Sequence, residues 1–270
     1  MLKRKHLWWH ELSKDEILED VKNCDIAILP IGATEQHGPH CPCGSDFYNA
    51  FGLAERIAEK TGAMLLPPLP YGAHPYHHWH MPGTIPVGYD THTALLCDIV
   101  RGAANAGYKK FIILSAHGQV ASTLVAMNKL GLEGYFVLTM HWYDFLRDNA
   151  TDLETPMTHA DEAETSVALH LYPQYVDMSK AIDDGGESLI NSKFQIKPGM
   201  AAEPGMMYHF EGTFARPEYI ELKSGVIGVP TLATKEKGEI IVNKCVDYVV
   251  EVIDDVKARY AVGEKPPVDR

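Results

Sequence analysis

The sequence lacks the features by which several large classes of protein are recognised. No block of Lys and Arg interrupts its 270 residues and the formal net charge is −12, which disfavours nucleic acids and anionic membrane surfaces as partners. No run approaches the roughly 20 apolar residues of a membrane span. The basic start, MLKRKHLWWHEL, continues with Trp8, Trp9 and His10 in place of an apolar segment, so we expect no signal peptide.

Cysteine is scarce, and the common nucleotide and nucleophile motifs are missing. The five cysteines are an odd number and widely spaced, in a chain long enough to bury a core without disulfides. We therefore expect reduced thiols and a cytoplasmic protein. The pair Cys41 and Cys43 has no second pair with which to form a zinc knuckle. The motifs G-x-G-x-x-G, G-x-x-x-x-G-K and G-x-S-x-G are absent, which argues against a nucleotide site and a catalytic-serine elbow.

Histidine and acidic residues, in contrast, are abundant. The chain has 14 histidines beside 36 Asp and Glu, so imidazole and oxygen ligands are plentiful. The stretch LPIGATEQHGPHCPCGSD, residues 29–46, follows an apolar run and gathers many of them between glycines and prolines. It is either a polar turn or half of a metal site, and only partners from elsewhere in the chain can decide.

Strand-like and helix-like segments alternate along the chain. Apolar runs predict strands at 25–32, 63–72, 110–118 and 135–140, and helical spacing predicts helices at 46–61, 91–107, 119–130, 160–171 and 237–260. Residues 225–234 suit a late strand or a loop. This alternation predicts an α/β fold with a mostly parallel sheet and helices on both faces, as a single domain over residues 1–270. Residues 183–219 lack periodicity and are predicted to be a surface excursion, an active-site cover or a subunit contact.

Charged clusters follow three of these segments. Glu35 and His37 come after the first strand, and Asp46 opens the next helix. His117 ends the strongest strand, and Glu164 lies one turn into a helix after a polar loop. Because functional groups gather at the carboxyl ends of strands in open α/β sheets, we expect these five side chains to converge.

Each of these residues also has an ordinary structural interpretation. Asp46 alone suits a helix cap, His117 a satisfied core histidine, and Glu164 a solvated helix residue. Their shared placement favours ligands of Zn²⁺, Mn²⁺ or Fe²⁺ in a site that leaves a position for water. Five ligands are enough for two metals if one carboxylate bridges, and His159 would then transfer protons beside the activated water.

Four motifs in the chain resemble those of the creatininase (creatinine amidohydrolase) family. Residues 29–46 resemble its P-x-G-x-x-E-Q-H-G-x-H-L-P-x-x-x-D signature, and HWHMPGTI, residues 78–85, is similar to its H-x-x-F-P-G-T-I loop. ILSAHGQV lies where the family has N-G-H-G-G-N, and HADEAETS resembles H-A-G-x-x-E-T-S. The resemblance puts the metal ligands on Glu35, His37, Asp46, His117 and Glu164. It puts a catalytic histidine on His159.

The resemblance also implies a fold, a cofactor and an assembly. These are a three-layer α/β/α sandwich, two divalent metal ions (Zn or Mn, with Fe in some members) and a homo-oligomer, often a hexamer. In creatininase a carboxylate two residues after the ligand histidine binds metal, whereas this chain has Gln119 there, so the fifth ligand is assigned to Glu164. The expected substrate-binding residues are His78, Trp79, His80, Gln119, Trp142 and Asp161. The aromatic segment 71–79 could equally form a subunit interface.

Three functions remain open from the sequence. The leading hypothesis is a metal-dependent hydrolase of a small polar cyclic substrate, which cleaves the C–N bond of a cyclic amide or formamide. The alternative keeps the metals but opens the ring of a keto-inositol such as 3-dehydro-scyllo-inosose by C–C cleavage. A hypothesis of another class is a non-catalytic metal-binding scaffold, which predicts a single, fully protein-ligated metal.

Overall fold

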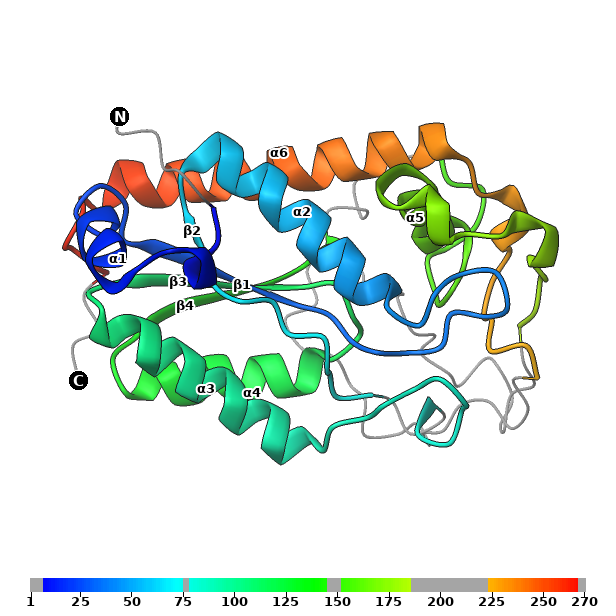
Figure 1. The fold of residues 1–270 in the computed structure, drawn as a ribbon, viewed down its shortest axis with the longest axis horizontal. Helices are drawn as coiled ribbons and strands as arrows, with labels where there is room; N and C mark the ends of the chain where they lie inside the picture. Colours follow the sequence, from blue (N-terminus) through cyan, green and yellow to red (C-terminus); the bar gives the residue numbers. More distant parts are fainter. Residues whose placement is uncertain (1–6, 75–77, 145–151, 186–222, 267–270) are drawn as a thin grey trace, which may run out of the picture.

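Four parallel strands in the order β2-β1-β3-β4 form the centre of the molecule (Figure 1). The structure is a computed structural model and describes residues 7–74, 78–144, 152–185 and 223–266. The strands are β1 (Ile26–Ile31), β2 (Met64–Leu65), β3 (Lys110–Ser115) and β4 (Phe136–His141). β1 and β3 pair along their full length, from Ile26 opposite Lys110 to Ile31 opposite Ser115. The predicted strands are therefore confirmed, although the second is short.

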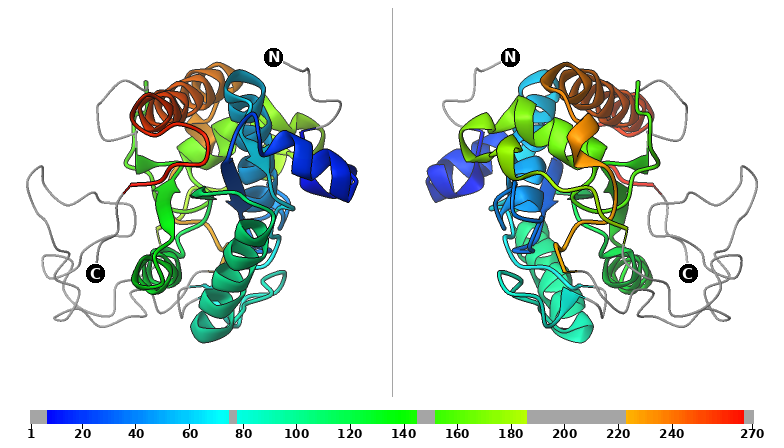
Figure 2. Two further views of the ribbon diagram at one scale, coloured as in Figure 1. Left: turned by 90° about the vertical axis from the view of Figure 1, so that its left-hand side faces the viewer. Right: turned by 90° about the vertical axis from the view of Figure 1, so that its right-hand side faces the viewer.

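Two layers of helices cover the two faces of the sheet. The helices are α1 (Lys14–Asp20), α2 (Ser45–Thr61), α3 (Tyr89–Asn105), α4 (Val120–Leu132), α5 (Glu162–Leu171) and α6 (Lys235–Arg259). Short 3-10 turns are η1 (Trp9–Glu11), η4 (Pro173–Tyr175), η5 (Met178–Lys180) and η7 (Pro230–Leu232). α2, α5 and α6 lie on one side and α3 and α4 on the other, with the strands between them (Figures 1 and 2). The fold is the predicted three-layer α/β/α sandwich.

The alternation of side chains along each strand explains why both faces need covering. Ile26 and Ile28 of β1 pack into one apolar cluster with α2 and α6. Ala27 and Leu29 point to the opposite face, into the cluster formed with α3 and α4. Successive strand residues face opposite sides, and all six residues of β1 are buried. A strand that is apolar at every position is typical of a parallel sheet covered on both faces.

The structure differs from the predicted elements in two places, β2 and α1, and it selects the loop from the two alternatives for residues 225–234. β2 ends at Leu65 although the apolar run extends further, because the prolines at 67, 68 and 70 cannot donate ladder hydrogen bonds. Residues 225–234 form a loop ending in η7, with isolated bridges from Ile227 to His159 and from Gly228 to Asp184. Helix α1 was not predicted, although its capping box, formed by Ser13 and Glu16, is a sequence signal for a helix start.

The strand order places a topological switch between β1 and β3. The chain crosses from β1 to β2 in one direction, whereas β3 and β4 follow on the other side of β1. Loops that leave neighbouring strands in opposite directions open a crevice at the carboxyl edge of the sheet. Four of the five predicted ligands, Glu35, His37, Asp46 and His117, follow these two strands. Most of the expected 183–219 excursion lies outside the described residues, and among those described no helix is long and apolar enough to cross a membrane.

Candidate metal centre

The loop after β1 is shaped by a close approach to α2. A Cβ on Gly32 would lie 2.5 Å from the backbone nitrogen of Phe47, so only glycine lets the end of β1 pass the first turn of this helix. Further along, the backbone N–H of Glu35 donates to the carbonyl of Cys43 at 2.8 Å, which closes the turn. Together these contacts bring Asp46, in the first turn of α2, beside the Glu35 segment.

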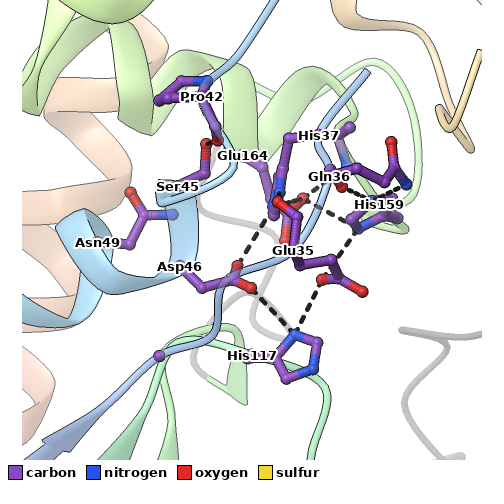
Figure 3. A network of polar contacts seen from close by, with 12 residues as sticks. Glu35, Gln36, His37, Pro42, Ser45, Asp46, Asn49, His117, His159 and Glu164 are labelled. Carbon is purple, nitrogen blue, oxygen red and sulfur yellow. Dashed lines mark hydrogen bonds and ion pairs between the residues drawn. The ribbon is translucent and has the colours of Figure 1, made fainter. Parts of the chain in front are cut away.

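Asp46 lies between two histidines. Its Oδ1 is 3.3 Å from Nε2 of His37, and its Oδ2 is 3.1 Å from Nδ1 of His117 (Figure 3). The N-cap of α2 is Gly44, so Asp46 is not the cap of its helix. A carboxylate that points its two oxygens at two different imidazoles has the geometry of a bridge between two cations.

Glu164 reaches the same place from α5. Its Oε2 is 3.4 Å from Nε2 of His37 and accepts a hydrogen bond from the backbone N–H of Ala160 at 2.6 Å. Ala160 has φ of 50°, the left-handed region that residues with a Cβ seldom adopt. This strained residue turns the chain between His159 and α5, and the N–H that it directs at Glu164 fixes one carboxylate oxygen.

Glu35 is surrounded by imidazoles. Its Oε2 is 3.0 Å from Nδ1 of His117, and its Oε1 is 3.2 Å from Nδ1 of His74 and also contacts His78. The side chain is almost completely buried, 1% exposed. A buried carboxylate among three histidines from two separate segments requires that some of these rings, or an ion between them, carry positive charge.

Backbone carbonyls fix which nitrogen of each histidine faces the carboxylates. Nδ1 of His37 lies 3.0 Å from the carbonyl of Glu35, and Nε2 of His117 lies 3.0 Å from the carbonyl of Ala73. A carbonyl accepts only from N–H, so these nitrogens carry the hydrogens. The opposite nitrogens, which face Asp46, then present lone pairs to its oxygens. Only a cation between them, a proton or a metal ion, makes this arrangement favourable.

The pKa values of His37, His117 and Glu35 also indicate that positive charge is favoured between these side chains. Burial would lower the pKa of His37 and of His117, but the nearby carboxylates raise both well above the usual value. Burial would likewise raise the pKa of Glu35, but His117, His78 and His159 hold it well below its usual value. Glu35 therefore stays ionised. Protons and metal ions compete for the same nitrogens.

The ligand atoms form groups of the size that metal ions need. Three triplets have their atoms within 4.8 Å of one another: Glu35, His74 and His117; Glu35, His37 and His159; and His37, Asp46 and Glu164. Ligands bound ~2.1 Å from one ion lie about 3.0 to 3.4 Å apart, which matches the contacts of Asp46 with both histidines. The donor set fits two divalent cations that share Asp46.

His159 faces this centre from the loop before α5. Its Nε2 donates to the carbonyl of Gln36 at 2.8 Å, and its Nδ1 lies 3.7 Å from Glu35 and 3.8 Å from Glu164. Burial and the neighbouring histidines hold the pKa of His159 well below its usual value, against the opposing effect of Glu35. The ring is therefore neutral near pH 7, with a lone pair directed at the carboxylates.

The expected substrate-binding residues are spread over several environments. His78 is buried against Glu35, whereas Trp79 and His80 are exposed. Trp142 is 1% exposed and packs in the core between the sheet and α6. Burial and packing do not test whether these residues contact a substrate. Substrate binding therefore stays a prediction for each of them.

Two of the expected substrate-binding residues make structural contacts. Both amide atoms of Gln119 engage other groups: Oε1 accepts from the N–H of Ala73, and Nε2 donates to Gly32 and Ser115. Asp161 caps α5 by accepting from the N–H of Glu164. Burial and the charge of Glu164 raise the pKa of Asp161 to about 7.

His74 lies in the centre although it is not among the ligands predicted from the sequence. It belongs to the segment 71–79, which was expected to line the pocket or an interface, but its ring lies with Glu35 and His117 in a ligand triplet. The rule that placed the other ligands would have found it, since His74 also follows a strand, β2, at the carboxyl edge of the sheet.

Comparison with known proteins gives consistent similarities. Residues 10–253 match the Creatininase family, described as creatinine amidohydrolase. The 3-dehydro-scyllo-inosose hydrolase of Thermotoga maritima is 31% identical over 272 residues, which cover 97% of this chain and 88% of that protein. The creatinine amidohydrolase of Pseudomonas putida is 26% identical over 249 residues, 84% of this chain and 88% of that one. A solved structure named "Creatininase Mn" matches with a TM-score of 0.74 at 25% identity, covering 93% of this chain and 98% of that one.

Proposed function

Since the chain belongs to the creatininase family, we propose that it is a metal-dependent hydrolase that opens the ring of a keto-inositol by cleaving a C–C bond. The observation that carries this choice is the likeness to 3-dehydro-scyllo-inosose hydrolase, which extends over 97% of the chain. The family match supports a small polar cyclic substrate in general. The full-length match to one relative supports the inosose among them.

The cofactor in this proposal is a pair of divalent cations, Zn²⁺ or Mn²⁺. Solved creatininases named for Mn and for a Zn-Zn type support this choice. Glu35 and His117 would hold one ion, His37 and Glu164 the other, and Asp46 both. When bound, the pair supplies water that ionises near neutral pH and an electrophile for the substrate's carbonyl oxygen.

His159 moves the proton in this reaction. Its neutral Nδ1 takes a proton as water adds to the ring ketone, and its Nε2–H stays on the carbonyl of Gln36. The C–C bond beside the former ketone then breaks, and the electron pair goes to the leaving carbon. Nδ1 returns the proton to that carbon, which leaves a linear polyol with one new carboxylate. A second carbonyl next to the leaving carbon would stabilise the electron pair as an enolate.

Hydrolysis of a cyclic amide is the second candidate. The likeness to creatinine amidohydrolase, over 84% of this chain, favours it. The same residues would serve, with His159 delivering its proton to the departing nitrogen. The two reactions differ in the atom that receives the proton, because carbon replaces nitrogen as the leaving group.

This difference gives a direct experiment. The protein, loaded with Mn²⁺ or Zn²⁺, is incubated in D₂O with 3-dehydro-scyllo-inosose and, separately, with creatinine, a hydantoin-like cyclic amide and a formamidopyrimidine. C–C cleavage releases one proton per turnover in a pH-stat and leaves one deuterium on carbon in the product. Amide hydrolysis delivers the proton to nitrogen and adds no deuterium to carbon, so the carbon-bound deuterium separates the two reactions. Turnover of the amides alone would refute the inosose proposal.

The oligomeric state and the cellular location are two further inferences. We infer a homo-oligomer, with a hexamer favoured by the family resemblance, which size-exclusion chromatography with light scattering would measure. All five cysteines are free thiols, which supports the inference of a reducing, cytoplasmic environment. A monomer at micromolar concentration would contradict the first inference.

A further inference from the structure

The geometry points to His74 as an additional metal ligand, which we propose completes the half of the centre formed by Glu35 and His117. This inference rests on the proposed metal-dependent function and specifies its ligand set. Nδ1 of His74 lies 3.2 Å from Oε1 of Glu35, and the ring centroids of His74 and His117 are 4.6 Å apart. One nitrogen of His74 forms a ligand triplet with these two residues.

The segment before His74 is held so that the ring cannot move far. Leu69 forms a parallel bridge with Ile31, so the chain beyond β2 runs beside the end of β1. The carbonyl of His74 accepts hydrogen bonds from Nε1 of Trp79 at 3.0 Å and from the hydroxyl of Tyr89 at 3.1 Å. A histidine whose backbone is fixed in this way is preorganised to bind an ion.

Ala73 ties this segment to the His117 loop. Its N–H donates to Oε1 of Gln119 at 3.2 Å, and its carbonyl accepts from Nε2 of His117 at 3.0 Å. Gly72 makes this contact possible, because a Cβ there would lie 2.5 Å from Oε1 of Gln119. The backbone that orients His117 therefore also presents His74, so the two rings are positioned as one unit.

Gln119, the other side chain that could take this coordination position, is excluded because its hydrogen bonds already engage it. Gln119 lies two residues after His117, but its amide oxygen and nitrogen are both engaged by Ala73, Gly32 and Ser115. The His74 ring has no such engagement: among the described residues its one hydrogen-bond partner is Glu35, which it contacts through Nδ1. The ring is 0% exposed, so Nδ1 is held beside the carboxylate with which it would share an ion.

His74 could instead only donate a hydrogen bond from Nδ1 to Glu35. Two substitutions separate these roles, because each keeps one property of the Nδ1 position. His74→Asn keeps an N–H that can donate to Glu35 but is a poor metal ligand. His74→Asp keeps a ligand atom for the metal, now a carboxylate oxygen, but cannot donate a hydrogen bond to Glu35. It also places a second carboxylate beside Glu35.

The test measures Co²⁺ binding by competition with a chelator. We expect His74→Asn to lower the affinity for one of the two Co²⁺ ions by more than roughly 100-fold, the upper value for loss of an outer-shell partner. His74→Asp should lower that affinity by a smaller factor. The reverse order would overturn the proposal. His141→Gln is the matched control, since His141 is also buried at this edge of the sheet and belongs to none of the ligand triplets found among the described residues.

A measurement on the unsubstituted protein keeps the proposal testable if these variants fold poorly. Each Co²⁺-bound histidine shows a strongly shifted, exchangeable proton NMR signal from its other N–H. We expect such signals for His37, His74 and His117, with the His74 signal from Nε2. Two bound ions without a signal from His74 would overturn this inference and leave the proposed function intact, whereas failure to bind Co²⁺ at all would refute the proposed function.

Discussion

The two ends of the parallel sheet both bury carboxylates, but only one end neutralises them within the chain. At the amino end, Oδ1 of Asp25 accepts from Nζ of Lys110 at 2.6 Å and Oδ2 accepts from the N–H of Gly263 at 2.9 Å. Lys110 also donates to the carbonyl of Ala261 at 2.9 Å. Each charge there has an opposite charge and a further hydrogen bond, so this pair closes the fold and attaches the segment after α6.

At the carboxyl end the charges do not balance. Glu35, Asp46 and Glu164 are all buried, and neither oxygen of Asp46 has a hydrogen-bond partner among the described residues. The nearest nitrogens belong to His37 and His117, whose hydrogens point to backbone carbonyls. A buried cluster with surplus negative charge is stable only with a cation, whereas the balanced pair at the other end is complete without one.

The largest expected effect is at Asp46. We predict that Asp46→Asn abolishes binding of both metal ions together and lowers kcat/KM by at least about 1,000-fold, because the shared carboxylate is lost. Metal content per chain by mass spectrometry and turnover of the ring substrate are the measurements. Retention of one ion at full occupancy would show that Asp46 is not the bridge.

His159 should separate catalysis from metal binding. His159→Gln keeps a donor for the carbonyl of Gln36 but has no nitrogen in the Nδ1 position. We expect kcat to fall about 100- to 10,000-fold, as for loss of a general acid–base group, with both ions retained. A variant that loses metal in parallel with activity would make His159 a ligand and would contradict its role in proton transfer.

At the amino end a similar substitution should affect stability instead. Asp25→Asn removes the partner of a buried ammonium, which typically costs ~3–5 kcal/mol of the free energy of unfolding. Urea denaturation would measure this loss, while metal content and kcat per folded molecule stay at the values of the unsubstituted protein. A loss of metal in this variant would break the distinction between the two ends.

The smallest expected effect is on the pH dependence of stability, which should differ between metal-free and metal-loaded protein. In protein stripped by a chelator, carboxylates raise the pKa of His37 and His117 well above 6.5 against burial. The folded state then holds these protons more tightly than the unfolded state does. Their stabilisation is full below pH 6.5 and is lost as pH rises through the raised pKa values.

Metal should reverse this trend, because the ions bind the deprotonated nitrogens. Melting temperatures of stripped and metal-loaded protein between pH 6.5 and 9 would measure both curves. We expect the stabilisation by metal to grow with pH over this range. A metal-induced shift that is constant or shrinks with rising pH would contradict the assignment of His37 and His117 as ligands.

Most of the fold could be predicted because its strands are apolar on both faces and its helices end at clear signals. The carboxyl-edge rule brings Glu35, Asp46 and His117 together from the sequence pattern alone, and the contacts among these side chains agree with it. Their role as metal ligands stays a prediction. The single domain over residues 1–270 also stays a prediction, since residues 186–222 lie outside the described part of the chain.

The remaining details depend on contacts that a linear pattern does not contain. The backbone of Ala73 engages Gln119 through its N–H and His117 through its carbonyl, and so connects the two loops. The burial of Trp142 in the core likewise depends on the path of α6. Residue type alone made Trp142 and Gln119 reasonable contacts for a substrate, and only their packing gives them other neighbours.

Anomalous diffraction from crystals of the Mn²⁺- or Zn²⁺-loaded protein tests the central claim most directly. The account predicts two peaks ~3.5–4 Å apart on either side of the Asp46 carboxylate, one beside His117 and one beside His37. A single peak, or two peaks that do not both contact Asp46, would contradict it.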